Sequence, residues 1–144
     1  MGMIRLGNKP PLTVAPGDSA RDAARAMTAR HVGAAAVVDG STVLGVVTER
    51  DVLQKVVAEG KDAALVRVRD IMSSPARAIG LSTSVDEAAE LMRKHHIRHL
   101  VVLDEDGRLA GMLALRYLLY EMMDDMQRNV GDLLGYIMAD SPGG

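Results

Sequence analysis

The hydrophobic and polar positions follow a pattern that occurs twice along the chain. Apolar residues at i, i+3, i+4 and i+7 appear once, and a second set follows 65 residues later: Ala20, Ala23, Ala24 and Met27, then Val85, Ala88, Ala89 and Met92. This spacing predicts one buried helical face in each copy. We expect the helices to begin after the N-cap residues Asp18 and Thr83 and to end near His31 and His96.

Apolar runs before and after these helices predict strands. Two strands joined by an Asp/Gly turn are expected after each helix, at 35–39 with 43–47 and at 100–104 with 109–113. A short extended segment precedes each helix, at 12–15 and 76–79, and a second helix begins near Glu49 and Leu115. Each copy is thus predicted to be a β-α-β-β-α unit. Strands that are apolar at nearly every position indicate a sheet covered on both faces.

We predict that the two repeat units pack together and are followed by a C-terminal tail. A unit of about 60 residues has a thin core, so we expect the copies to pack sheet against sheet with pseudo-two-fold symmetry in an α/β (α+β) fold. The predicted parts are a first repeat, a linker, a second repeat and a C-terminal helical tail, at 12–58, 59–67, 68–120 and 121–144. Residues 68–72 are expected to form a short helical turn.

Composition excludes several classes of function. The chain has no Cys, so a disulfide framework, a thiol nucleophile and Cys-ligated zinc are excluded. Only 2% of the residues are aromatic and the net charge is −2, which argues against a nucleic-acid partner. No apolar run approaches the roughly 20 residues that span a bilayer, and the first residues lack the apolar stretch of a signal peptide. We therefore expect a cytoplasmic protein without membrane contact.

The sharpest candidate site is the segment from Thr48 to Asp51, where a predicted strand turns into a helix. Free amides and the positive dipole end at such a junction favour a phosphate, and Thr48 can add a hydroxyl. Asp51 can accept two hydrogen bonds from a ribose diol. The same Thr-x-x-Asp pattern is also a capping box that needs no ligand. Arg50, which recurs as Arg116 in the second copy, can supply positive charge to phosphates or lie solvated at the helix start.

A basic cluster at 93–99 is the second candidate site. His95 and His99 have the i, i+4 spacing of metal ligands, but the helical pattern fails near Ile97 and no acidic partner is close. We therefore expect no metal site. The cluster is either a solvated helix end, where cations are favoured, or a ligand contact.

The doubled pattern resembles a pair of cystathionine-β-synthase (CBS) domains. The resemblance covers about 12–120 and rests on the segments VRDIM at 68–72, VDEAAELM at 85–92, IRHLVVLDEDGRLAG at 97–111 and GVVTERDVL at 45–53. It implies adenosine-containing ligands in clefts between the repeats. In particular, it implies that Thr48 and Asp51 hold phosphate and ribose. It also implies ligand contacts from two other segments, at Ser74 and Ala76 and at Ile97, Arg98 and His99.

The second repeat departs from the family pattern. Ala114 and Tyr117 stand where Thr48 and Asp51 stand in the first repeat. Alanine has no hydroxyl, and tyrosine cannot accept a diol as a carboxylate does. We therefore expect one nucleotide site of the ordinary kind.

The apolar residues from 118 to 138 have the spacing of a helix, so we expect a helical tail. Its apolar residues recur every three or four positions. Gly131 and Gly135 weaken the helix by roughly 1 kcal/mol each relative to Ala, which leaves open a break near 131. The stripe either packs on its own module or contacts a dimer partner or another protein, for which adaptable Met side chains are suited.

These features predict a non-catalytic regulatory or signal-transduction module that senses AMP, ADP or ATP, with no obligatory cofactor. No nucleophile or acid/base pair points to an enzyme. We expect a homodimer and a separate regulated protein as partners. The alternative is a protein-interaction module with a vestigial nucleotide site.

Overall fold

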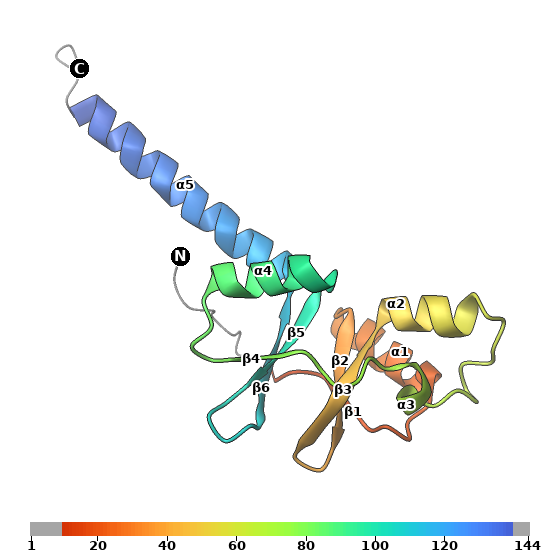
Figure 1. Ribbon diagram of the computed structural model, residues 1–144. Coiled ribbons are helices and arrows are strands. Elements are labelled where there is room, and N and C mark those ends of the chain that lie inside the picture. Colours follow the sequence, from red (N-terminus) through yellow and green to blue (C-terminus); the bar gives the residue numbers. More distant parts are fainter. Residues whose placement is uncertain (1–9, 140–144) are drawn as a thin grey trace.

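The computed structural model describes residues 10–139, and the side chains of residues 10–131. Two small three-stranded sheets form its centre (Figure 1). The elements of the first half are β1 Thr13–Val14, α1 Ala20–Arg30, β2 Ala34–Asp39, β3 Thr42–Thr48, α2 Glu49–Val52 and the π-helical segment η1 Leu53–Val57. The elements of the second half are α3 Val68–Ile71, β4 Ala78–Gly80, α4 Val85–His95, β5 His99–Leu103, β6 Leu109–Ala114 and α5 Leu115–Ala139.

The two sheets have the same topology. In the first, β1 pairs in parallel with β2, and β2 pairs antiparallel with β3; in the second, β4, β5 and β6 pair in the same way. The antiparallel pairs even share a register irregularity at matching points, between Val37 and Val38 and between Val102 and Leu103. The α/β fold of two β-α-β-β-α repeats is therefore confirmed.

The predicted N-caps of the two long repeat helices are wrong by one residue. Ser19 caps α1, because its hydroxyl accepts a hydrogen bond from the N–H of Asp22 at 3.0 Å. Asp18 instead closes the preceding turn by accepting from the N–H of Ala15 at 2.9 Å. Ser84 replaces Thr83 in the same way at the start of α4.

The predicted C-terminal ends of these helices are confirmed. His31 and His96 cap α1 and α4 in the left-handed conformation, with φ of 56° and 54°. Each repeat thus turns out of its helix with the same backbone geometry and enters the following strand.

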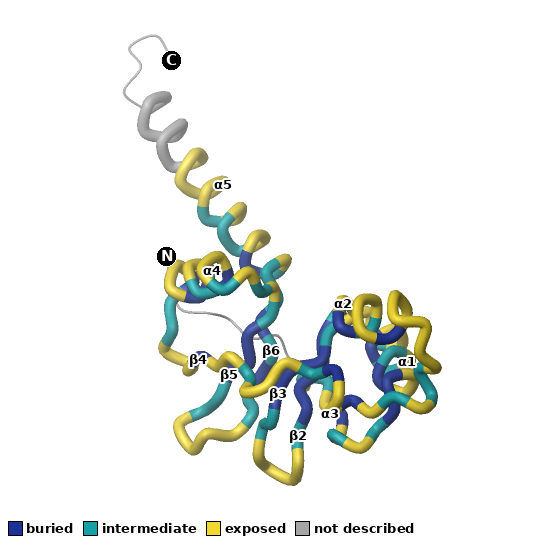
Figure 2. Tube along the Cα trace, turned by 45° about the vertical axis from the view of Figure 1, so that its right-hand side comes forward, coloured by how far each residue is buried: buried dark blue, intermediate teal, exposed yellow. Residues whose placement is uncertain are grey.

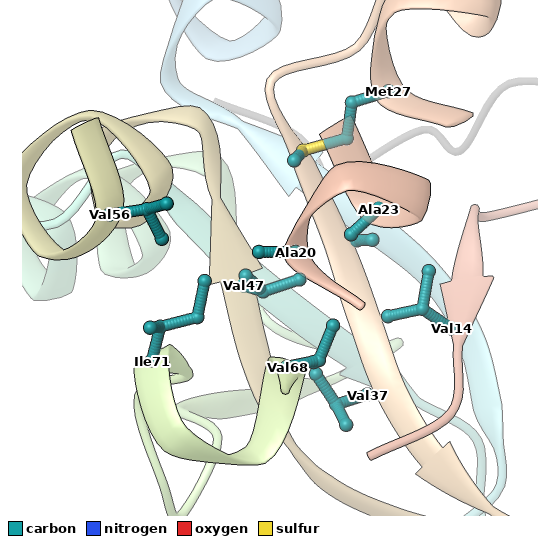
Figure 3. Packing of buried hydrophobic residues seen from close by; sticks show 10 residues of the cluster. Val14, Ala20, Ala23, Met27, Val37, Val47, Val56, Val68 and Ile71 are labelled. Carbon is teal, nitrogen blue, oxygen red and sulfur yellow. The ribbon is translucent and has the colours of Figure 1, made fainter. Parts of the chain in front are cut away.

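The described residues form three hydrophobic clusters, one within each repeat and one between the two sheets. The first repeat has a core between its sheet and its helices, where Met27, Val47, Val56 and Ile71 converge (Figure 3). The second repeat has an equivalent core around residues such as Leu100 and Leu118. A third cluster joins the sheets to each other through Ala34, Val46 and Val101. Strands β2 and β5 are therefore covered on both faces, as their composition predicts (Figure 2).

The short helix α3 belongs to the second repeat by sequence but packs in the first. Val68 and Ile71 are buried in the first core, and the N–H of Val68 donates to the carbonyl of Asp18 at 2.8 Å. The segment that enters the second repeat is therefore fixed against the first repeat before β4 begins.

Helix α5 is continuous from Leu115 to Ala139, so the helix does not break near Gly131. Its first turns pack on the second core through Leu118, which is 1% exposed. Beyond α4 the helix extends away from both sheets (Figures 1 and 2). Within residues 10–139, no helix combines the length and the apolar character needed to cross a membrane.

Candidate ligand-binding cleft

A cleft of about 1280 Å³ lies between the two repeats. Three segments and Gly33 line it; the segments are the junction of β3 and α2, the extended chain from Met72 to Ala78, and the turn from α4 into β5. All eight residues predicted for the ligand site lie along it, namely Thr48, Arg50, Asp51, Ser74, Ala76, Ile97, Arg98 and His99. The fold therefore brings together residues that are up to 51 positions apart in the sequence (from 48 to 99), and their role toward a ligand remains a prediction.

Thr48 and Asp51 form a complete capping box at the start of α2. The N–H of Asp51 donates to Thr48 Oγ1 at 3.1 Å, and the N–H of Thr48 donates to Asp51 Oδ2 at 2.9 Å. The Thr48 hydroxyl also lies 3.2 Å from Asp51 Oδ2. The structural alternative weighed for this motif is thus realised, and both side chains still line the cleft.

Lys55 holds the other oxygen of the Asp51 carboxylate, with Nζ 3.1 Å from Oδ1. The same ammonium group donates to the carbonyl of Ile71 at 2.8 Å. Asp51 is 8% exposed, so its carboxylate is buried and partnered on both oxygens. Sequence reasoning missed Lys55, although its i, i+4 spacing from Asp51 is a signal for such a pair.

The extended chain that forms the second wall is bonded to β3. Val46 and Ser73 exchange two backbone hydrogen bonds of 3.0 and 2.9 Å, and the Ser74 hydroxyl donates to the carbonyl of Leu44 at 2.9 Å. Gly45 makes this approach possible, because a Cβ there would stand 2.4 Å from the Ser73 carbonyl oxygen. The Ser74 hydroxyl is therefore used to hold the wall in place.

The third wall, the turn from α4 into β5, contains two histidines whose pKa values are lowered, His95 and His99. Burial lowers the pKa of His99, Arg98 lowers it further, and the Glu49 carboxylate partly opposes both. Burial also lowers the pKa of His95, with a contribution from Arg77, whose Nη1 lies 3.4 Å from His95 Nε2. The lowered pKa values favour the neutral form of both imidazoles, in which one ring nitrogen donates and the other accepts a hydrogen bond.

The cleft is locally positive although the whole chain carries a net charge of −2. Its lining includes four fixed cations and two carboxylates: Arg50, Lys55, Arg77 and Arg98, with Glu49 and Asp51. A concave surface with excess positive charge favours an anionic ligand. No group of three or more His, Asp or Glu side chains suited to a metal ion occurs in the described part of the chain.

The equivalent position in the second repeat is built differently. Tyr117, which stands where the first repeat has Asp51, is partly buried and packs against the second core. Ala114 ends β6 where Thr48 ends β3. Ala114 and Tyr117 therefore occupy positions equivalent to Thr48 and Asp51, and a single nucleotide site of the ordinary kind remains a prediction.

Comparison with known proteins agrees with this architecture. The model of the CBS domain family matches residues 4–58 and 68–124, so it finds two copies. An uncharacterized protein from Methanopyrus kandleri is 34% identical over 109 residues, which are 75% of this chain and 56% of that protein. The chain thus spans little more than half the length of that relative.

Solved structures extend the comparison. A CBS domain protein from Burkholderia ambifaria is 36% identical, with a TM-score of 0.77 over 83% of this chain and 86% of its own. A CBS domain protein from Pyrobaculum aerophilum, solved in complex with AMP, is 30% identical, with a TM-score of 0.71 over 82% of this chain and 95% of its own.

Proposed function

Because the chain belongs to the CBS domain family and carries two such domains in tandem, we propose that it is a non-catalytic regulatory module that binds an adenosine nucleotide between its repeats. The observation that carries this proposal is the convergence of the eight predicted residues on one cleft with excess positive charge. The complex of the Pyrobaculum relative with AMP supports the ligand class.

In this proposal, different residues along the cleft contact the phosphates, the ribose and the adenine of the nucleotide. Arg50 and Arg98 attract the phosphates. Asp51 accepts from the ribose hydroxyls, in exchange for its present contacts with Lys55 and the Thr48 hydroxyl. Adenine lies against aliphatic side chains and backbone, because none of the described residues that line the cleft is Phe, Tyr or Trp.

A regulatory role follows from the position of the cleft between two units. The ligand contacts both repeats, so it favours the relative arrangement of the repeats that it binds more tightly. Such coupling has an effect only when two arrangements differ in affinity for the ligand. We propose a separate protein as the receiver of that change.

Calorimetric titration with AMP, ADP and ATP tests the proposal. We expect at least one of the three to bind the wild type, and Asp51→Ala to weaken it roughly tenfold or more through the loss of hydrogen bonds to a charged group. Asp39→Ala is the matched control, because Asp39 is exposed and lies outside the cleft. Circular dichroism verifies that both variants are folded. Failure of all three nucleotides to bind the wild type would refute the proposal.

A protein-interaction module with a vestigial site is the second candidate. It is favoured by the internal pairing of the Asp51 carboxylate and by the exposed apolar residues of α5. On this alternative, deletion of 127–144 abolishes association with the partner, while Asp51→Ala has no effect on it.

A further inference from the structure

Helix α5 carries a row of exposed apolar side chains in a strict spacing. Leu119, Met123, Met126 and Val130 are 49%, 55%, 64% and 55% exposed. They are separated by four, three and four positions, and the same alternation continues in the sequence to Leu133 and Ile137, within the bounds of α5. Apolar residues that repeat every 3.5 positions are typical of a seam between supercoiled helices.

This row is separate from the face by which α5 packs on its own repeat. Leu118 is buried in the second core, and Leu115 and Met122 are partly buried against it. Met123, Met126 and Val130 follow that contact in the sequence and are exposed, and Figure 1 shows that α5 extends away from the body beyond α4. No other described residue of this chain therefore buries the row of apolar side chains.

The residue types in the row fit one kind of partner. In heptad notation, the a positions are Met123, Val130 and Ile137, and the d positions are Leu119, Met126 and Leu133. β-Branched residues at a with Leu at d favour parallel two-stranded coiled coils. The two central Met residues fill the remaining layers with adaptable side chains.

The flanks of the row permit pairing with an identical helix. The e and g positions carry no charge, being Tyr120, Gln127 and Leu134 at e and Met122, Asn129 and Tyr136 at g. Charged residues lie on the outer face, where Arg128 pairs with Asp125 on the same helix. Two copies in register therefore meet without like charges across the seam. Gly131 and Gly135 also fall at outer positions.

We propose that α5 pairs with α5 of a second copy as a parallel, in-register coiled coil centred near Met126 and Val130. The seam from 119 to 137 is about 27 Å long at a rise of about 1.5 Å per residue. Fewer than three heptads give a short contact, so the dimer forms in a concentration-dependent manner. This inference does not depend on nucleotide binding.

Disulfide trapping tests both the partner and the orientation, because the chain has no cysteine of its own. Met126→Cys and Val130→Cys each place a thiol on the seam, and Arg128→Cys is the matched control on the outer face. Under mild oxidation we expect a cross-linked dimer for both seam variants, at least tenfold more than for the control. Equal cross-linking at all three sites, or none at the seam, would overturn the proposal.

Sedimentation velocity over a range of concentrations gives an independent test. The wild type is expected to shift from monomer to dimer, and Val130→Asp to remain monomeric while its circular dichroism spectrum stays native, because residue 130 is exposed and outside both cores. A wild type that stays monomeric throughout would assign the seam to a different protein and overturn the proposal. A dimer that survives Val130→Asp would place the interface elsewhere and do the same.

Discussion

His99 lies at the start of β5 on the wall of the cleft and is partly buried. Burial lowers its pKa in the folded protein below the value near 6.5 that it has in the unfolded chain. As the pH falls through about 6.5, the unfolded chain takes up a proton that folded His99 does not, so the free energy of unfolding decreases with falling pH. Above about pH 7.5 this residue contributes no slope.

Urea denaturation between pH 5 and 8 checks this expectation. His99→Gln keeps a polar side chain that does not titrate, so it should flatten the loss of stability at acidic pH. Some slope should persist, since burial also lowers the pKa of His95. Identical slopes for the wild type and His99→Gln would contradict the assignment.

Single residues also show where sequence reasoning reaches its limit. The pair Thr48 and Asp51 satisfies a capping box and a ribose-phosphate site equally well, because both need a hydroxyl and a carboxylate one turn apart. The structure shows that the capping contacts are made and that the pair faces the cleft. Lys55 was missed although it lies one turn after Asp51, whereas Arg77 joins the site only because the fold brings a distant segment to the cleft.

At the scale of elements, the extended chain beside β3 depends on Gly45. Gly45→Ala would place a Cβ 2.4 Å from the Ser73 carbonyl oxygen, a backbone atom that cannot rotate away. The wall of the cleft must then shift, and we expect a loss of about 1–3 kcal/mol in the free energy of unfolding. Chemical denaturation measures this loss.

Gly80→Ala provides the comparison for that substitution. Gly80 also belongs to a strand, but nothing lies within 4 Å of a Cβ built there. Its stability should change by no more than about 0.5 kcal/mol. If Gly45→Ala changed the free energy of unfolding as little as Gly80→Ala, the close contact inferred between Gly45 and Ser73 would be contradicted.

The elements themselves were largely predictable, and their ends less so. Apolar spacing fixed the repeat helices and the strands because burial requires it. The N-caps were one residue off because Asp18 and Ser19 are both good capping types and only the backbone decides between them. The sequence left open whether the helix breaks at Gly131, and the helix continues because a local propensity cost of about 1 kcal/mol does not end a helix whose neighbouring turns are favourable.

At the scale of the whole molecule, two repeats of one topology differ in their chemistry. The cleft that contains Asp51 combines segments from both repeats. Sequence alignment of the two halves predicted the difference at Ala114 and Tyr117, because it compares positions that the fold makes equivalent. It could not predict the net charge of the cleft, which depends on which side chains meet there.

Arg50 and Arg116 provide an internal test of this difference. They occupy matching positions at the starts of α2 and α5, and both are exposed, but only Arg50 lines the described cleft. If the proposed nucleotide site is correct, Arg50→Ala removes a cation from the phosphates and weakens binding about fivefold to tenfold, with a smaller dependence on salt. Arg116→Ala should leave the affinity unchanged. Calorimetric titration at 50 and 200 mM salt distinguishes the outcomes, and equal effects of the two variants would indicate nonspecific electrostatic attraction instead of a site in the Asp51 cleft.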